Sequence, residues 1–528
     1  MEPVVMAVDV GTGSARAALF DRAGRMLGRA EHPILLHGPQ PEHAEHSSTD
    51  IWQAVGEAAR AARERAGVRP EQVGGISFDA TCSTVVLDAD ARPVSVSTTG
   101  EDRWDVIVWL DHRAVAEAEA CTASGHQVLD YVGGVMSPEM ATPKLMWLSR
   151  HLPASWARVG RLFDLADFLT FKASGSLARS ECTVTCKWTY LAHAHPGWRQ
   201  DFFAAMGLDD LVERGALPVR ASPVGSDLGP LTPAAAETLG LTTACHVGAG
   251  LIDAHAGALG VLGAVAQEGP AALDRHLALI AGTSSCHMAL SPDARSVRGV
   301  WGPYFGAVLP GLWLNEGGQS ATGALLDHII RLHSAGAALG DHPHARILER
   351  ILELRAAEGE GFAAGLHVLP DFHGNRSPLA DPHATGVISG LTLDRSFDAL
   401  CRLYFRTALA IALGTRHILD ALNRKGWAID TLHLTGGHVR NPLLVELYAD
   451  ATGCDVVLPA EEDAVLLGTA MAAATAAGLH PDLAAAAAAM ARDGRRIRPE
   501  PARRPALERD WQAFILMHEQ RRALDALG

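Results

Sequence analysis

The chain repeats one short pattern at half its length, and this repeat limits the folds that it can adopt. The apolar run at 4–10 leads through a Gly-Thr turn into a second apolar run at 14–20. The same order returns in IAGTSSCHMALSPDAR at 280–295, where Gly282 follows Gly11 by 271 residues (282 − 11) in a chain of 528. The repeat predicts two similar domains, each beginning with a β-hairpin; chance recurrence of a four-residue motif is the alternative.

Length and composition agree with two folded domains. A chain of 528 residues is too long for one ordinary core, so two domains of roughly 250 residues each are expected. The residues are 48% hydrophobic and 20% charged, which is typical of a globular protein. We place the boundary in the Gly- and Ala-rich stretch at 255–275, which divides the chain into residues 1–258 and 259–528.

Charge, hydropathy and cysteine use argue against several classes of protein. A net charge of −15 argues against nucleic acid as a partner, because phosphate backbones are bound by basic stripes. No apolar run reaches the ~18 residues that a membrane span needs. The first strand follows almost at once with no basic segment before it, so no signal peptide is expected. Eight cysteines without a C-x-x-C pair favour a reduced, cytoplasmic protein over a zinc protein.

The remaining patterns predict a chain of mixed α/β type. Short apolar runs predict strands, and apolar spacing near 3.6 residues predicts helices. Beyond the two hairpins, strands are expected at 25–31, 73–78 and 83–87, and helices at 49–67, 398–424, 463–478 and within the last thirty residues.

The two Gly-Thr turns carry groups that bind phosphate. Glycine lets the backbone approach a ligand closely, and backbone N–H groups can point at anionic oxygens. Thr12, Ser14, Thr283 and Ser284 add hydroxyl donors. One such turn is a common hairpin connection, but two with the same flanking strands favour a phosphate site. The chain has no G-x-x-x-x-G-K-[ST] and no G-x-G-x-x-G, which argues against a P-loop protein and against a dinucleotide-binding dehydrogenase.

Two further candidates stand at strand ends. In LHLTGGHVRNPLL (432–444) a strand runs into Gly436 and Gly437 before a helix that begins near Pro442. This corner leaves room for a flat base or a ribose, unless it is a plain tight turn. Asp253 stands between a glycine-rich strand end and a helix of small residues. It either caps that helix or acts as a general base that takes a proton from a substrate hydroxyl.

Together these segments resemble the FGGY family of carbohydrate kinases over nearly the whole chain. The most specific strings are DATCS, GLIDAHAGALGV and PDFHGNRSPLAD, and VWLDHRA, PKLMWL, CKWTY and NEGGQSATG are similar as well. The resemblance implies two ribonuclease-H-like domains, as in actin, hexokinase and the Hsp70 ATPase, with an active site in the interdomain cleft. The chain departs from the family at Ala410, where an acidic helix residue is usual, and we expect that position to be structural.

The resemblance implies that ATP and Mg²⁺ bind between the two domains. Asp9 is similar to the metal-associated aspartate of the first phosphate loop, and Asp253 is similar to the catalytic base and is also assigned to the metal. The residues expected at the nucleotide are Gly11, Thr12, Gly13, Ser14 and Arg16 in the first loop, Gly282 and Thr283 in the second, and Gly318, Thr322, Gly436, Gly437 and Asn441 farther along.

The resemblance also implies phosphorylation of a ketopentose, with D-ribulose converted to D-ribulose 5-phosphate as the expected reaction. L-ribulose and the pentitol ribitol are alternatives, and a non-catalytic, actin-like ATP-binding sugar sensor is an alternative of another class. A homodimer is a family-level expectation. Lysine occurs only at 144, 172, 187 and 425, which independently draws attention to Lys187. The expected sugar contacts are Asp79, Ala80, Thr81, Cys82, Trp109, Asp111, Arg113, Lys187, Asp253 and Glu316.

Overall fold

Each half of the chain builds one mixed β-sheet in this computed structural model, which describes residues 3–461 and 463–527. The first sheet has the order β3 (Met26–Pro33), β2 (Ser14–Phe20), β1 (Val4–Val10), β5 (Val73–Ala80), β10 (His246–Ile252), β9 (Asp227–Pro230). The second has the order β13 (Trp301–Phe305), β14 (Trp313–Gln319), β12 (Ser285–Ser291), β11 (His276–Ala281), β17 (Thr431–Thr435), β18 (Asp455–Pro459), β19 (Asp493–Ile497).

The two sheets confirm the predicted repeat. In the first, β2 is antiparallel to β1 while β5 and β10 run parallel to it, and in the second β12 is antiparallel to β11 while β17 and β18 run parallel to it. The order β3-β2-β1-β5-β10 therefore corresponds to β14-β12-β11-β17-β18. Both predicted hairpins lie at corresponding places, at the centre of their sheets. This architecture is the expected pair of ribonuclease-H-like domains.

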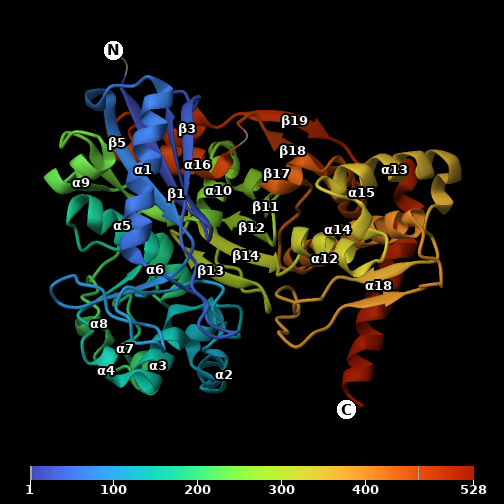
Figure 1. Cartoon of the computed structure of the whole chain (residues 1–528), viewed down its shortest axis with the longest axis horizontal. Coiled ribbons are helices and arrows are strands. Elements are labelled where there is room, and N and C mark those ends of the chain that lie inside the picture. Colours follow the sequence, from blue (N-terminus) through green and yellow to red (C-terminus); the bar gives the residue numbers. More distant parts are fainter. Residues whose placement is uncertain (1–2, 462, 528) are drawn as a thin grey trace.

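Helices cover both sheets and form the outer parts of two lobes (Figure 1). In the first half they are α1 (Ser48–Ala66), α2 (Val115–Ala123), α3 (Ala141–His151), α4 (Pro153–Trp156), α5 (Leu165–Ser174), α6 (Glu181–Lys187), α7 (Gln200–Ala205), α8 (Leu211–Arg214), α9 (Pro233–Leu239) and α10 (Asp253–Leu262). In the second half they are α11 (Pro270–Leu273), α12 (Gly323–Leu332), α13 (Pro343–Glu358), α14 (Phe397–Asn423), α15 (Pro442–Thr452), α16 (Ala464–Ala476), α17 (Leu483–Met490) and α18 (Arg504–Asp525).

Four short strands make a further small sheet, and two more pair as a hairpin. The small sheet has the order β4 (Glu45–His46), β7 (Val106–Ile107), β6 (Thr84–Leu87), β8 (Arg161–Asp164), and the hairpin is β15 (His367–Leu369) with β16 (Val387–Ser389). The predicted strands and helices are confirmed, with ends that differ by one or two residues. Among the described residues, no helix is both long enough and apolar enough to cross a bilayer.

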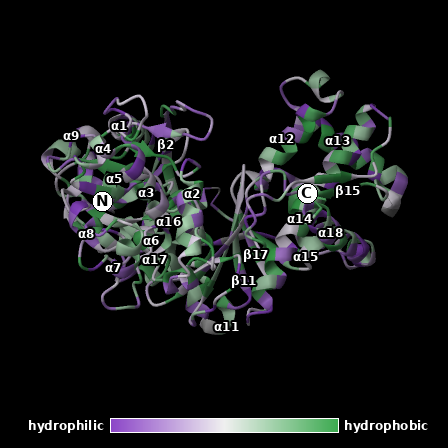
Figure 2. Cartoon of the chain, turned by 90° about the horizontal axis from the view of Figure 1, so that it is seen from below, coloured by the Kyte–Doolittle hydropathy of each residue, from purple (hydrophilic) through white to green (hydrophobic). Residues whose placement is uncertain are grey.

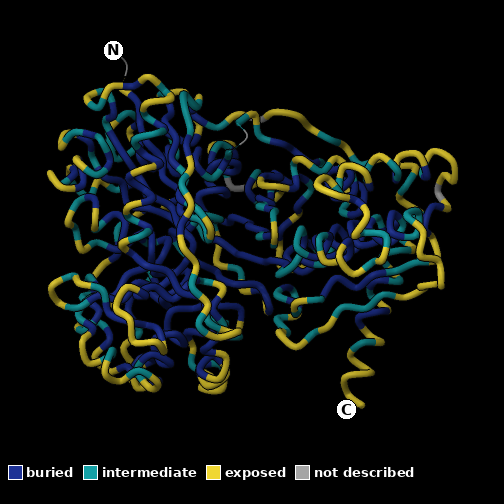
Figure 3. The backbone as a smooth tube through the Cα atoms, in the orientation of Figure 1, coloured by how far each residue is buried: buried dark blue, intermediate teal, exposed yellow. Residues whose placement is uncertain are grey.

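Strand β1 shows how alternation builds the first core. Met6 and Val8 face a cluster that includes residues of α1 and α5, while Val5 and Ala7 face a second cluster that includes residues of α16. This is the two-sided burial expected of a central strand whose successive side chains point to opposite faces. Strand β1 is buried along its whole length, whereas the last turns of α18 are exposed (Figure 3).

Helix α16 comes from the second half of the chain but lies in the first lobe, against β1, β5 and β10 (Figure 1). It also crosses α10, the helix that follows the last parallel strand of the first sheet. A Cβ atom at Gly468 would lie 1.9 Å from the carbonyl oxygen of Ala256, and one at Gly260 would lie 2.1 Å from that of Ala464. Only glycine allows this close crossing. The boundary between residues 258 and 259 stays a prediction.

Seen from below, the two lobes lie side by side, with β11 and β17 of the second sheet between them (Figure 2). The carboxyl ends of β1, β5 and β10 are where Asp9, Asp79 and Asp253 stand. In open sheets of this kind, ligands bind beyond the carboxyl ends of the parallel strands. A ligand site is therefore expected at these three carboxylates.

Candidate active site

Three carboxylates that the sequence analysis singled out, Asp9, Asp79 and Asp253, lie together at the carboxyl ends of the parallel strands of the first sheet. Asp9 pairs in register with Asp79 on the parallel strand β5, and with Arg16 on the antiparallel strand β2. Nη2 of Arg16 lies 2.6 Å from Oδ2 of Asp9. Asp253 is the first residue of α10, and its Oδ1 accepts a hydrogen bond of 2.7 Å from the N–H of Ala254. Strand register thus brings together residues that are far apart in the sequence.

Burial and mutual repulsion raise the pKa values of these three carboxyl groups. Burial raises the pKa of Asp9 to about 7; Arg16 opposes this increase, and the charge of Asp253 adds to it. Burial also raises the pKa of Asp79 well above its ordinary value, with Asp9 adding to the effect, and it raises the pKa of Asp253. Within the described chain, Oδ1 of Asp9 and Oδ1 of Asp79 have no hydrogen-bond partner. Like charges held together in this way are typical of a functional site.

The first Gly-Thr turn is braced by the segment predicted to face the sugar. The N–H of Gly11 donates to the carbonyl of Ser14 and closes the turn. The carbonyl of Thr12 accepts from Nε2 of His46 at 3.1 Å, and the Thr12 hydroxyl accepts from the indole N–H of Trp109 at 2.9 Å. Burial lowers the pKa of His46 to about 4, so this ring is neutral near pH 7. A Cβ at Gly13 would meet no atom within 4 Å, which leaves that side of the turn open.

The second Gly-Thr turn meets the Gly-Gly corner that follows β17. Gly436 has a φ of +87°, and a Cβ there would lie 2.5 Å from the carbonyl oxygen of Ala281. The carbonyl of Gly282 accepts from Nε2 of His438 at 2.8 Å and from the hydroxyl of Thr322 at 3.0 Å. Glycine at 436 is therefore required for the corner to approach the turn. These contacts bring together Gly282, Thr322 and Gly436, three of the residues predicted to hold the nucleotide.

A pocket of about 840 Å³ opens beside this turn. Its size suits a ligand larger than a simple sugar. Gly282, Thr283, Gly437 and Asn441, four of the residues predicted to contact the nucleotide, are among those that line it. Gly436 and Thr322 contact the second Gly-Thr turn. Gly318 packs against the neighbouring strand β12, where a Cβ would lie 2.8 Å from the carbonyl oxygen of Ser285. The other lining residues include Asp327, Asp341, His342, His344, Tyr404, His438 and Arg440.

One wall of this pocket carries a hydrogen-bonded relay that the sequence did not indicate. The side-chain N–H of Asn441 donates to the hydroxyl of Tyr404 at 3.2 Å, and that hydroxyl lies 2.9 Å from Nδ1 of His344. Nε2 of His344 lies 2.8 Å from Oδ1 of Asp327. Oδ1 of Asn441 caps α15 by accepting from the N–H of Leu444, which fixes the direction of its amide. Residues of α12, α13 and α14 therefore form a relay that fixes the orientation of the Asn441 side chain in the pocket wall.

The predicted sugar contacts Lys187 and Glu316 lie in a second cluster, close to Asp253. Lys187 ends α6, is 3% exposed, and places Nζ 4.1 Å from the ring centre of Trp301. Burial alone would raise the pKa of Glu316, but nearby positive charge, from Lys187 first, holds it below its ordinary value. Asp253 is within electrostatic reach of both residues. The cluster thus pairs a buried cation with a buried, ionised carboxylate beside the candidate base.

Two residues of this cluster were not assigned from the sequence. Nη2 of Arg376 lies 2.8 Å from Oε1 of Glu316, and its guanidinium stacks 4.0 Å from the ring centre of Trp301. Nε2 of His255 lies 3.6 Å from Oε2 of Glu316. Burial lowers the pKa of His255 to about 4, so this ring is neutral near pH 7 and the two cations carry the local charge. Arg376 stands in the string PDFHGNRSPLAD, and that motif was the available signal.

The substrate segment after β5 lies against the same cluster. The N–H of Thr81 donates to the carbonyl of Val10, which ties the segment that begins at Ala80 to the first Gly-Thr turn. Burial raises the pKa of the Cys82 thiol to about 12, while the charge of Lys187 lowers it. The peptide carbonyl of Trp109 accepts from Nζ of Lys144 at 3.1 Å, so a buried lysine holds in place the separate segment that carries Trp109.

Asp111 and Arg113 are not available for the sugar contacts that we expected of them. Their side chains form a fully buried ion pair at 2.7 Å, and Arg113 also contacts Glu45 at 2.9 Å. Oδ2 of Asp111 accepts from the N–H of Ala44 at 2.6 Å. Because the Arg113 side chain is 0% exposed, this pair holds the segment that carries Trp109 rather than reaching a ligand. A charged residue in a polar loop can form all its ion pairs and hydrogen bonds within its own chain, and its position in a motif does not show this.

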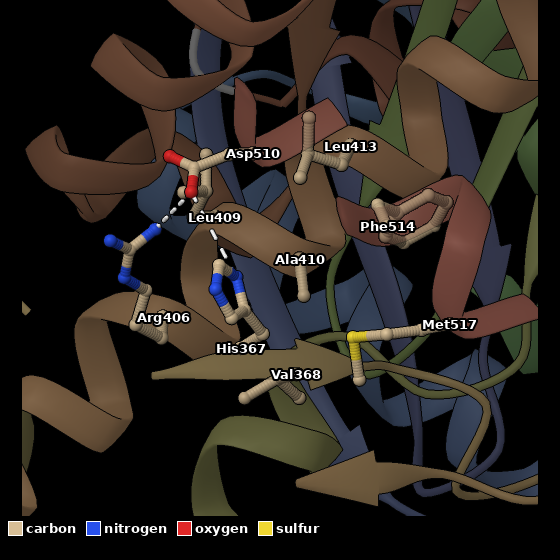
Figure 4. Close-up of a pocket in the computed structure, with 9 residues that line it drawn as sticks. All are labelled: His367, Val368, Arg406, Leu409, Ala410, Leu413, Asp510, Phe514 and Met517. Atoms are coloured by element: carbon tan, nitrogen blue, oxygen red, sulfur yellow. Dashed lines mark hydrogen bonds and ion pairs between the residues drawn. The ribbon is translucent and has the colours of Figure 1, made fainter. Parts of the chain in front are cut away.

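The departure at Ala410 lies away from the site. Ala410 faces α18 across a small pocket of about 10 Å³ (Figure 4), too small for more than about one water. A carboxylate is present there: Asp510 of α18 lies 2.7 Å from Nη1 of Arg406. This placement agrees with a structural role for the position.

Two sheets of matching order, with Gly-Thr turns after their first strands and carboxylates at the edge of the first, define the class of two-domain folds to which hexokinase and actin belong. Residues 4–260 match the FGGY family of carbohydrate kinases, N-terminal domain, and residues 277–477 match its C-terminal domain. The chain therefore belongs to the FGGY family of carbohydrate kinases, and it is a carbohydrate kinase.

Three relatives show how far the likeness extends. An FGGY carbohydrate kinase domain-containing protein of Danio rerio is 46% identical, over 98% of this chain and 97% of that protein. A D-ribulokinase of Saccharomyces cerevisiae is 39% identical, over 89% of this chain and 71% of that protein. The crystal structure of a xylulose kinase from Rhodospirillum rubrum has the same fold, with a TM-score of 0.79 and 25% identity over 99% of both chains.

Proposed function

We propose that the protein transfers the γ-phosphoryl group of ATP to the terminal hydroxyl of a ketopentose, with D-ribulose as substrate and D-ribulose 5-phosphate as product. The observation that carries this proposal is that Asp253 lies within electrostatic reach both of Arg16, which pairs with Asp9, and of the buried residues Lys187 and Glu316. The likeness to the yeast D-ribulokinase supports the choice of sugar. L-ribulose and ribitol remain the alternatives within the same chemistry.

In this proposal ATP lies between the lobes with its phosphates on both Gly-Thr turns. The 840 Å³ pocket beside Gly282 takes the adenosine, against Gly437 and Asn441. Backbone N–H groups of the two turns and the guanidinium of Arg16 then offer donors to phosphate oxygens. The sugar lies on the other side of Asp253, next to Lys187 and Glu316.

Asp253 is the proposed general base. Its Oδ1 accepts from the N–H of Ala254, and we assign its other oxygen to the sugar hydroxyl. As the hydroxyl oxygen bonds to the γ-phosphorus and the bond to the ADP oxygen breaks, the hydroxyl proton passes to Asp253. The transition state of such a transfer is loose, so orientation of the hydroxyl contributes more than base strength. Closure of the lobes excludes water, which would otherwise accept the phosphoryl group.

The carboxylates at this edge fit Mg²⁺. Magnesium prefers oxygen ligands and is usually held by one or two carboxylates together with water and phosphate oxygens. Oδ1 of Asp9 is buried without a hydrogen-bond partner in the described chain, and Asp253 lies within electrostatic reach. The described residues contain no group of three or more His, Cys, Asp or Glu side chains arranged as a complete metal site. When bound, Mg²⁺ supplies charge neutralisation on the phosphate oxygens, and Asp9 and Asp253 are the residues that would hold it.

A coupled ADP-release assay tests the proposed reaction. Purified protein with Mg-ATP is offered D-ribulose, L-ribulose, D-xylulose, ribitol and glycerol in turn. We expect the largest kcat/KM with D-ribulose. Preferred turnover of another sugar or of a polyol would refute the substrate but keep the kinase chemistry. No stimulation by any acceptor, from protein that binds ATP, would refute the proposed reaction. The homodimer and the cytoplasmic location stay predictions.

The Tyr404→Phe variant tests the relay at the nucleotide pocket. Loss of the hydroxyl leaves the Asn441 amide and Nδ1 of His344 without their shared partner, which costs about 1 kcal/mol per bond. We expect the KM for ATP to rise about fivefold to tenfold, while kcat and the KM for the sugar stay unchanged. Initial rates with each substrate varied in turn provide the measurement. Asp341→Asn, in the same pocket but outside the relay, is the control, and equal effects from both variants would contradict the assignment.

A further inference from the structure

Arg376 has donor capacity left over after its contacts within the protein. It stands in the loop between β15 and β16, and its Nη2 binds Oε1 of Glu316 at 2.8 Å while its guanidinium stacks on Trp301. Its Nε is buried, and the described chain offers that N–H no hydrogen-bond partner. Oε2 of Glu316 is likewise buried without one. Buried groups of this kind are costly to leave unpaired, so both point to a ligand.

Three side-chain contacts hold the loop around Arg376 in place. The side chain of Asn375 donates to Oδ1 of Asp371 at 2.9 Å, and the hydroxyl of Ser377 donates to the carbonyl of Gly299 at 2.8 Å. On its other oxygen, Asp371 lies 3.6 Å from Nδ1 of His518 in α18. Anchored on both sides, the guanidinium is held in place before any ligand arrives, which lowers the cost of binding.

The free groups of this cluster have opposite and fixed hydrogen-bonding roles. Arg376 and Lys187 can only donate, and the ionised Glu316 can only accept. A ketone oxygen can only accept, whereas a hydroxyl must also place its hydrogen. A ketone beside two cations therefore satisfies them fully, and the neighbouring hydroxyl donates to Oε2 of Glu316. In a pentitol the ketone is replaced by a hydroxyl, whose hydrogen would face the cations.

Building on the proposed function, we propose that Arg376 is a specificity-determining residue that selects ketoses over pentitols. Its Nε–H donates to the C2 carbonyl of the ketose, and Glu316 accepts from the adjacent C1 hydroxyl. Lys187, which stacks on the same indole as Arg376, supplies the second donor. This arrangement leaves the C5 end of the sugar to face Asp253.

The test compares acceptors that differ only at C2. D-ribulose is assayed beside ribitol and D-arabinitol, the two pentitols that its reduction gives, with saturating Mg-ATP. The variants are Arg376→Met and Arg376→Lys, of which the second keeps the charge that Glu316 needs but lacks the Nε–H. In both, we expect the ratio of kcat/KM for the ketose to kcat/KM for the pentitols to fall about tenfold to hundredfold, because a hydrogen bond to a charged group is lost.

Arg295→Met is the matched control. Arg295 also stacks on a tryptophan, 4.6 Å from the ring centre of Trp427, and pairs with Asp274 at 2.7 Å, at the far end of β11 from the Gly282 turn. This variant is expected to keep the wild-type ratio.

The outcomes separate this inference from the reaction itself. Wild-type protein that phosphorylates none of these acceptors refutes the proposed reaction. Wild-type protein that favours the ketose, together with an unchanged ratio in the Arg376 variants, refutes the role of Arg376 alone, as does a wild-type preference for a pentitol. If Arg376→Met fails to fold, Arg376→Lys decides the question.

Discussion

The Asp253→Asn variant is expected to lose sugar-dependent phosphoryl transfer by about 10²- to 10⁴-fold, the usual contribution of a general base. Asparagine keeps the shape of the side chain and caps helices as well as aspartate does. A residue that merely capped α10 would tolerate the change, so the two roles proposed for Asp253 give different results. The measurement is ADP release with and without the sugar, together with the melting temperature.

Asp463→Asn is the matched control for this variant. Asp463 is the N-cap of α16, the helix that follows β18 in the second repeat, and its Oδ1 accepts from the N–H of Leu466 at 3.3 Å. It occupies the place in the second repeat that corresponds to Asp253, and it makes a capping bond. We expect it to keep most of the activity. Full sugar-dependent activity in Asp253→Asn would remove this residue from the chemistry.

The Asp9→Asn variant is expected to be far less active and yet more stable. Loss of the negative charge beside the first Gly-Thr turn should reduce phosphoryl transfer by at least about a hundredfold, as the removal of preorganised electrostatic groups usually does. The pKa of Asp9 is about 7 in the folded protein and near 3.8 when exposed. Between these values the folded chain binds a proton that the unfolded chain does not, so stability falls as pH rises through this window.

The substitution removes that penalty. The gain in melting temperature over wild type, measured without metal, should be small below pH 4, grow between pH 4 and 7, and stay constant above it. The pKa difference sets an upper limit on the order of 4 kcal/mol. Asp21→Asn is the control, because Asp21 accepts from the N–H groups of Ala23 and Arg25 in an exposed turn and should lose stability. A lower melting temperature for Asp9→Asn at pH 8 would contradict the strain at this edge.

The local parts of the site could be predicted from the sequence. The Gly-Thr turns are continuous strings, and their recurrence at half the chain length gave the repeated fold. Asp253 stood out because a carboxylate between a glycine-rich strand and a small-residue helix has few uses. Only the first repeat carries a carboxylate before its turn: Asp9 corresponds to Ile280 (9 + 271), so the two turns are not equivalent.

The long-range parts could not be predicted in this way. Thr469 donates to Asp79 across 390 residues of sequence, and Arg376 reaches Glu316 across 60. Neither pairing leaves a periodic pattern in the chain. Arg113 shows the opposite case. Its motif predicted a sugar contact, but its guanidinium forms buried ion pairs with Asp111 and Glu45. Burial decides between a buried structural ion pair and a ligand contact, and burial is a property of the fold.

The packing of α16 in the first lobe determines how the protein responds to truncation of its chain. The helix that covers one face of the first sheet begins 460 residues after the start of β1 (464 − 4). A chain that stops before it leaves Val5 and Ala7 uncovered on that face, and an exposed apolar sheet face favours aggregation. An early stop codon and one shortly before residue 464 would therefore be equally harmful. The first lobe can therefore be completed only after the chain has been translated beyond α16.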